Sequence, residues 1–274
     1  MNLNEKYTAL VNRIKELGSA AVAFSGGVDS SFLCAAAVDA LKDKALAITV
    51  VSPMLPQSEI DCACRIAALT GIRHILIKEN DIDAQVAENP HDRCYHCKKI
   101  EFASIISAAK NEGAASVLDG SNTDDLSDYR PGLKALAELA VVSPLRDAGL
   151  SKAEIRELSK QKGLPTWNKP AFACLASRFP YGEKITREKL AQVEKAEDIM
   201  RDAGFVNFRV RYHGNVARLE VAPEERARFF DTAFLDALSA SIKRCGFLYA
   251  AFELEGYHTG SLNAALGKHT RRAL

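Results

Sequence analysis

Ala20-Ala21-Val22-Ala23-Phe24-Ser25-Gly26-Gly27-Val28-Asp29-Ser30 is the stretch that decides the fold of this chain. It begins as a short apolar strand over residues 20–24, turns at two adjacent glycines, and continues into a helix predicted over residues 29–42. The glycines permit positive φ values and a close approach of the backbone to an anion. The N-terminus of the following helix adds N–H donors and positive potential. The stretch therefore predicts a phosphate-binding loop, against the simpler alternative of a glycine turn that leads into a helix.

Apolar strands and helices alternate on both sides of this loop. Further strands are expected at residues 45–51, 74–77, 116–118 and 141–142. Helices are expected at residues 4–17, 57–70, 97–112, 131–139 and 151–162. Strands separated by helices of this length predict a doubly wound α/β domain, in which helices cover both faces of a parallel sheet.

The pattern changes after about residue 180. A helix at 186–203 is followed by strands at 206–212 and 216–221, a helix at 223–241 and a strand at 247–252. This order predicts a smaller C-terminal α+β domain. Because Pro170, Pro180 and Gly182 interrupt the periodicity, the predicted domains are residues 1–180 and 181–274.

The composition of the 274 residues narrows the class of protein. Hydrophobic residues make up 47% of the chain and charged residues 26%, as in ordinary globular domains. Lys and Arg number 36 and Asp and Glu 35, so no excess charge favours a nucleic-acid or membrane partner. The charged first 17 residues and the lack of a long apolar run predict a cytoplasmic protein. In a reducing compartment the seven cysteines are expected to be buried thiols, metal ligands or reactive groups.

The loop sequence SGGVDS (residues 25–30) resembles the pyrophosphate loop of the ATP pyrophosphatase superfamily, the PP-loop. The resemblance implies an adenine nucleotide alpha hydrolase-like fold and cleavage of ATP to AMP and pyrophosphate. The hydroxyls of Ser25 and Ser30 add hydrogen-bond donors, and Asp29 is a candidate ligand of Mg²⁺. The predicted ATP-binding residues are Ala23, Ser25, Gly26, Gly27, Asp29 and Ser30.

Three further stretches carry a second resemblance: NPHDRCYHCK (89–98), GSNTDD (120–125) with DYRPG (128–132), and KPAFACLASR (169–178). Together with the loop they resemble the LarE family of ATP-dependent sulfur transferases of nickel-pincer nucleotide synthesis, from residue 20 to about 263. The resemblance implies adenylylation of a carboxylate of pyridinium-3,5-biscarboxylic acid mononucleotide, followed by formation of a thiocarboxylate. It also implies a homo-oligomer, either a trimer or a hexamer.

The source of the sulfur has two alternatives. The residues Cys94-x-x-Cys97 alone fit a redox pair or half of a zinc site, and soft thiolates also suit iron–sulfur ligation. The family resemblance implies that Cys94, Cys97 and Cys174 hold a [4Fe-4S] cluster with one open iron. In the other version of the family Cys174 gives up its own sulfur and becomes dehydroalanine. Arg178 is predicted to lower the pKa of a thiol or to bind phosphate. Together with Cys174 and Asp29 it forms the predicted catalytic set.

Charged residues suggest where a substrate binds. Asp124, Asp125 and Arg130 follow the predicted strand at 116–118, at the sheet edge where such folds bind ligands, although a solvated turn would look similar. In the C-terminal domain, Arg209 and Arg211 share one face of a strand, and Glu220 lies on the facing strand. A charged outer sheet face explains this pattern, but the resemblance implies a site for the phosphate of the substrate.

Two other functions fit parts of the sequence. A tRNA thiolase has the same pyrophosphate loop. However, the nearly equal numbers of acidic and basic residues give no sign of the basic surface that RNA binding requires. A sensor that binds an adenine nucleotide without cleaving it would leave Cys94, Cys97 and Cys174 unexplained.

Overall fold

The computed structural model describes residues 1–127, 132–170, 173–258 and 261. Its contacts divide the chain into two compact units, the first formed by Met1–Asp81 and Asp92–Phe172 and the second by Ile82–His91 and Ala173–Leu274. Residues 82–91 thus group with the second unit, and the predicted boundary at residue 180 stays a prediction. No helix in the described ranges has the length and apolar character needed to cross a membrane.

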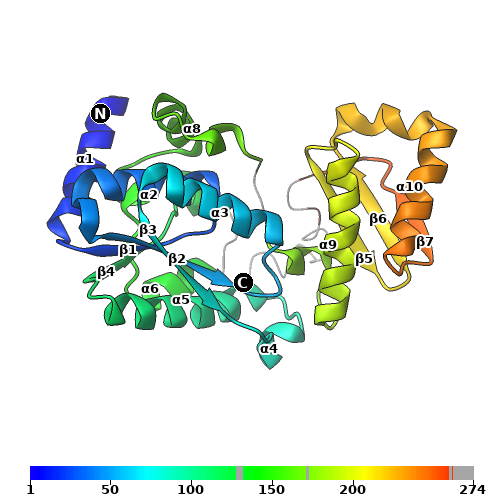
Figure 1. Cartoon of the computed structure of the whole chain (residues 1–274), viewed down its shortest axis with the longest axis horizontal. Helices are drawn as coiled ribbons and strands as arrows, with labels where there is room; N and C mark the ends of the chain where they lie inside the picture. The colour runs from blue at the N-terminus through cyan, green and yellow to red at the C-terminus, as the bar shows by residue number, and fades with distance from the viewer. Residues whose placement is uncertain (128–131, 171–172, 259–260, 262–274) are drawn as a thin grey trace. The chain divides into compact units, whose positions relative to one another are not determined.

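The first unit is built on a parallel sheet of four strands in the order β3-β2-β1-β4 (Figure 1). The strands are β1 (Ala20–Ala23), β2 (Ala45–Val51), β3 (Arg73–Lys78) and β4 (Ser116–Leu118). All three neighbouring pairs are parallel, which confirms the predicted α/β class. The expected strand at 141–142 is reduced to a single bridge between Val142 and Leu118.

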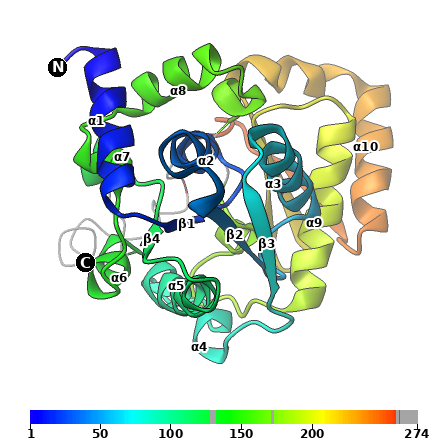
Figure 2. The same ribbon diagram turned by 60° about the vertical axis from the view of Figure 1, so that its left-hand side comes forward.

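Helices cover both faces of this sheet, as Figure 2 shows for α2 and α5. They are α1 (Leu3–Glu16), α2 (Val28–Leu41), α3 (Gln57–Thr70), α5 (Arg93–Asn111), α6 (Gly132–Glu138), α7 (Pro144–Asp147) and α8 (Lys152–Gln161). A hydrophobic core lies on each face of the sheet, and strand β1 contributes to both. Its residues Ala20 and Val22 pack with α1, α2 and α8, whereas Ala21 packs with α5 and α6. The alternation follows from the period of two along a strand.

The second unit contains a mixed sheet in the order β5-β6-β7. Strands β5 (Phe208–His213) and β6 (Val216–Val221) are antiparallel, and β7 (Tyr249–Phe252) runs parallel to β6. The helices are α4 (Ala84–Ala87), α9 (Arg187–Asp202) and α10 (Thr232–Arg244). The single helix expected at 223–241 is instead a 3-10 segment, η5 (Pro223–Phe230), followed by α10. Asp231 causes the break, because its side chain accepts hydrogen bonds from Ala233 N and Phe234 N and so caps a new helix.

Candidate functional site

The predicted phosphate loop joins β1 to α2 in the first unit. Gly27 is the N-cap residue of α2, and in the described part of the chain no side chain caps this end of the helix. The first-turn N–H groups and the positive end of the helix dipole therefore suit an anion. The hydroxyls of Ser25 and Ser30 lie 3.2 Å apart, and the Ser25 N–H donates to Ser30 Oγ over 3.3 Å. These contacts hold the loop in a compact turn.

Two glycines allow neighbouring elements to reach the loop. Gly26 has φ +71°, and a Cβ atom there would lie 3.2 Å from the Ala63 nitrogen and the Glu59 carbonyl oxygen of α3. Gly120 follows β4, and a Cβ atom there would lie 3.2 Å from the Ser30 nitrogen. Helix α3 and the segment after β4 therefore both pack against the loop backbone.

A cavity of about 430 Å³ lies beside the loop in the first unit. It brings together several residues predicted from sequence, namely Ala23, Ser25, Gly27, Asp29, Ser30, Cys94 and Asp125. Gly26 and Asp124 are absent from the lining residues, and Arg130 lies outside the described residues. The phosphate loop and Cys94 thus line one cavity.

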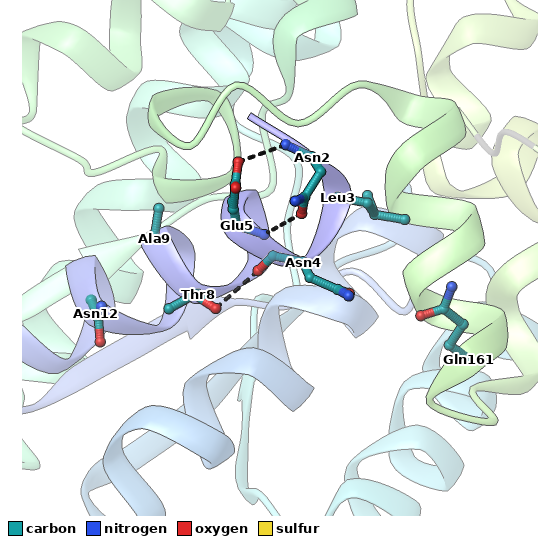
Figure 3. Close-up of a pocket in the computed structure, with 8 residues that line it drawn as sticks. All are labelled: Asn2, Leu3, Asn4, Glu5, Thr8, Ala9, Asn12 and Gln161. Atoms are coloured by element: carbon teal, nitrogen blue, oxygen red, sulfur yellow. Dashed lines mark hydrogen bonds between the residues drawn. The ribbon is translucent and has the colours of Figure 1, made fainter.

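A second hollow, of about 730 Å³, lies over α1 and is shown in Figure 3. Glu5, the charged residue among those that line it, accepts from Asn2 N over 2.8 Å, while Glu5 N donates to Asn2 Oδ1 over 3.0 Å. These bonds form the capping box of α1. The carboxylate that lines this hollow is therefore accounted for by the capping of α1.

Asp29 combines a buried oxygen with a lysine partner. Its Oδ2 pairs with Lys152 Nζ of α8, and its Oδ1 is buried without a hydrogen-bond partner in the described structure. Burial raises the pKa of Asp29 above its ordinary value, and the positive charge of Lys152 opposes that shift. An unpartnered carboxylate oxygen at the cavity wall fits a hard cation such as Mg²⁺.

The acidic segment after β4 is held by its own hydrogen bonds. Asp119 accepts from Ser121 N over 3.0 Å and from the hydroxyls of Ser121 and Ser143. Asp125 accepts from Asn122 N over 3.0 Å, and Asp124 accepts from Lys152 N over 2.9 Å. Asp124 thus caps α8 from a neighbouring loop, while Asp119 and Asp125 line the cavity.

Helix α5 places three side chains of the cysteine motif on its first turns. It begins at Arg93 rather than at the predicted residue 97, so Cys94 and Cys97 lie one turn apart on one side of the same helix. Lys98, which the sequence did not single out, follows on the cavity wall with its Nζ 3.4 Å from Glu101 Oε2. Burial alone would lower the pKa of Lys98, but Glu101, Asp119 and Cys97 together raise it. Lys98 therefore brings a stable positive charge to the cavity.

Cys174 lies in the second unit, directly before the 3-10 turn η4 (Leu175–Arg178). The side chain of Arg178 is 1% exposed and binds both oxygens of Glu197, over 2.8 and 2.9 Å. Its Nη1 donates to the carbonyl oxygens of Ala173 and Cys174, over 2.6 and 3.2 Å. Arg178 therefore fixes the backbone on which Cys174 sits, and its predicted catalytic role stays a prediction.

The predicted phosphate-binding residues of the second unit are buried. Arg209, Arg211 and Glu220 are 8%, 7% and 1% exposed, unlike a solvated sheet face. Arg211 donates to Glu220 Oε2 and to Ser177 O, each over 2.8 Å, and so contacts the turn that carries Cys174. Burial, together with the charge of Arg178, lowers the pKa of Arg209. Guanidinium groups gathered in this way suit an anionic ligand.

The predicted cluster ligands divide between the units. Cys94 and Cys97 lie in the first unit and Cys174 in the second, and no disulfide involves any of the seven cysteines. Among the residues that the structure describes, no three His, Cys, Asp or Glu side chains gather into a metal-binding group. The three-thiolate set stays a prediction.

Comparison with known proteins places the chain in a family. The asparagine synthase family model matches residues 7–128. The uncharacterised protein slr1717 of Synechocystis sp. is 43% identical over 97% of this chain and 100% of its own length. The pyridinium-3,5-bisthiocarboxylic acid mononucleotide synthase of Lactiplantibacillus plantarum is 36% identical over 97% of this chain and 96% of its own length. The glutamine-hydrolysing GMP synthase of Aeropyrum pernix is 26% identical over 69% of this chain and 40% of its own length. With these matches and a phosphate loop of the expected geometry, the chain belongs to the LarE family, that of the L. plantarum synthase, in the PP-loop ATP pyrophosphatase superfamily.

Proposed function

We propose that this chain is an ATP-dependent sulfur transferase that converts a carboxylate of pyridinium-3,5-biscarboxylic acid mononucleotide into a thiocarboxylate. The observation that carries the proposal is the 430 Å³ cavity, which residues of the phosphate loop and Cys94 line together. A phosphate cradle beside a thiol suits a reaction that joins ATP cleavage to sulfur transfer. The name of the 36% identical relative, a pyridinium-3,5-bisthiocarboxylic acid mononucleotide synthase, supports the choice of substrate.

In the first step a carboxylate oxygen of the substrate attacks the α-phosphorus of ATP. The bond from the α-phosphorus to its bridging oxygen breaks, and pyrophosphate leaves with the electron pair. The N–H groups at the start of α2, the hydroxyls of Ser25 and Ser30, and Lys98 stabilise the negative charge that develops on the leaving group.

Asp29 is the proposed Mg²⁺ ligand. Its buried Oδ1 lacks a hydrogen-bond partner in the described structure, and Asp125 adds a second carboxylate to the same cavity. Two carboxylates with phosphate oxygens and water are the ligands that Mg²⁺ prefers. When bound, the ion neutralises charge on the phosphates. Lys152, the partner of Asp29, favours the ionised carboxylate and so opposes the effect of burial on the pKa of Asp29.

In the second step sulfur attacks the acyl carbon, and the bond from this carbon to the AMP oxygen breaks. We assign the sulfur to a centre formed by Cys94, Cys97 and Cys174. Cys94 is exposed and Cys97 half-buried on the first turn of α5, which fits two thiolate ligands. A [4Fe-4S] cluster held there would supply an open iron that carries hydrosulfide. In the alternative, the Cys174 thiolate attacks; its Cβ–Sγ bond then breaks with loss of the Hα proton, leaving dehydroalanine.

The second unit is proposed to bind the mononucleotide. Arg209 and Arg211 contact its phosphate, and Glu220 holds Arg211 in place over 2.8 Å. Arg178 orients the Cys174 turn through the two carbonyl oxygens that it binds. In the first unit, Asp124 and Asp125 shape the segment near the substrate, and Arg130 completes the predicted substrate-binding set. A trimer or hexamer is the proposed assembly.

The test is an anaerobic turnover assay with ATP, Mg²⁺ and the biscarboxylic acid mononucleotide. Substrate-dependent AMP and a product in which sulfur replaces one carboxylate oxygen are expected, with the product identified by mass spectrometry. Cys174→Ala should abolish the thiocarboxylate, whereas Cys64→Ala, which removes an exposed thiol of α3, should retain it. AMP formation without sulfur incorporation, or no AMP with this substrate, would overturn the proposal.

A further inference from the structure

Lys169 reaches the back of the phosphate loop. Its Nζ donates to the Gly26 carbonyl oxygen over 3.0 Å, to Glu59 Oε2 over 2.8 Å, and to Cys62 Sγ over 3.2 Å. The Lys169 and Glu59 side chains are 19% and 10% exposed, so the pair is largely shielded from water. All of these groups belong to the first unit.

The hydrogen bond to Gly26 determines where the next N–H group points. The chain has no cis peptide bond among its described residues, and in a trans peptide the carbonyl and the N–H point in opposite directions. The Gly26 carbonyl points toward Lys169 and α3, so the Gly27 N–H points to the other side. Gly27 lines the cavity, and Gly26 does not. Lys169 therefore directs an N–H donor toward the anion position.

This peptide needs an external restraint. It joins two glycines, neither of which has a Cβ, so its plane can rotate at low energetic cost. Helix α3 leaves little room for a larger residue at Gly26, because Ala63 and Glu59 backbone atoms lie 3.2 Å from the position of a Cβ. Glycine at position 26 therefore accommodates α3, and the hydrogen bond from Lys169 fixes the orientation of the Gly26–Gly27 peptide plane.

We propose that Lys169 is a positioning residue of the phosphate loop: by holding the Gly26 carbonyl, it orients the Gly27 N–H toward the β,γ-pyrophosphate of ATP. Glu59 holds the lysine in place from α3. This proposal shares one assumption with the proposed function, namely that the ligand is a nucleoside triphosphate cleaved to a monophosphate and pyrophosphate. It does not depend on sulfur transfer.

The experiment titrates the full-length protein calorimetrically with Mg·ATP, Mg·pyrophosphate and adenosine. Lys169→Met should weaken binding of both phosphate ligands by about tenfold or more, the size expected for a lost hydrogen bond to a charged ligand. Adenosine affinity should change by less than about threefold, because adenosine carries no phosphate for the Gly27 N–H to bind. Lys169→Arg keeps the charge and donors and should recover most of the affinity.

Lys162→Met is the matched control, because Lys162 also forms one ion pair, with Asp39 over 2.6 Å, and its side chain is 26% exposed. It should bind all three ligands as the wild type does. Glu59→Gln removes the ion pair of Lys169 but keeps the lysine. It should weaken binding of the two phosphate ligands less than Lys169→Met does, and it replaces Lys169→Met as the test if that variant does not fold. An equal loss of affinity for adenosine and for ATP would overturn the proposal. Unchanged pyrophosphate binding in both Lys169→Met and Glu59→Gln would overturn it as well. A wild type that bound none of these ligands would overturn it too, whereas ATP binding without sulfur transfer would overturn only the proposed function.

Discussion

Arg178 shows how a single residue can have a structural role that its sequence context hides. Its position four residues after Cys174 predicts a group that acts on the thiol or on phosphate. In the structure its guanidinium is fully buried and binds Glu197 with two nitrogens and backbone carbonyls with the third. Glu197 also accepts from Val210 N over 3.0 Å, so one carboxylate connects α9, β5 and the Cys174 turn. The pair is therefore a structural centre of the second unit.

Replacing Glu197 by Gln should destabilise the protein strongly. The change removes one charge of a buried pair and leaves the Arg178 charge without compensation, which typically reduces the free energy of unfolding by about 3–5 kcal/mol. The measurement is urea unfolding followed by circular dichroism and by tryptophan fluorescence. Trp167 lies in the first unit, so its fluorescence separates the unfolding of that unit from the signal of the whole chain.

The control lies one residue further along α9. Asp198 pairs with Arg201, but both side chains are exposed, 50% and 41%, so Asp198→Asn should change stability by less than about 1 kcal/mol. If the two variants unfolded at the same urea concentration, the Arg178–Glu197 pair would not have the structural role assigned to it.

At the scale of elements, the contact between α3 and the phosphate loop depends on one glycine. Gly26 and Gly71, the residue that ends α3, both have φ +71°, but no atom lies within 4 Å of a Cβ position at Gly71. Gly71→Ala therefore measures the cost of the left-handed backbone alone, about 1–2 kcal/mol of stability. Gly26→Ala should destabilise more and also weaken Mg·ATP binding, because α3 must move away from the loop. Thermal unfolding and ATP titration of the two variants test this, and equal effects would show that α3 does not constrain the loop.

The sequence predicted most elements because their boundaries are local. The apolar run of β2 and the amphipathic spacing of α3 are confirmed to the residue. The sequence predicts the start of this helix at residue 97, after a polar stretch, whereas α5 begins at Arg93. The helix predicted at 223–241 was too long because the cap at Asp231 follows only from its side-chain bonds.

The site was predictable only where its residues form a continuous motif. The loop at 25–30 and the cysteines of α5 are predicted in this way. Lys152 and Lys169 resemble ordinary surface lysines in sequence, yet they contact Asp29 and Gly26, which lie 123 and 143 positions away. Only the fold shows that these lysines belong to the loop.

At the scale of the whole molecule, the chain passes between the two units at 81/82, 91/92 and 172/173. Cys94 and Cys174 each follow one of these passages within three residues. The predicted ligands of the cluster thus come from both units, two from the first and one from the second. A cluster that needs all three would be lost when either unit fails to supply its thiolate.

Iron and acid-labile sulfide content, with a visible spectrum, tests this dependence on protein purified and reconstituted without oxygen. We expect about four iron and four sulfide per chain in the wild type, and a large loss in both Cys94→Ala and Cys174→Ala, because each removes one of three thiolates. Cys64→Ala is the control, since Cys64 is an exposed thiol of α3 outside the predicted set. If iron and sulfide were lost in Cys94→Ala but retained in Cys174→Ala, the cluster would be bound by the first unit without Cys174. No iron in the wild type after reconstitution would exclude the cluster and leave Cys174 as the sulfur donor, in which case the intact protein should lose the mass of one H₂S after a single turnover.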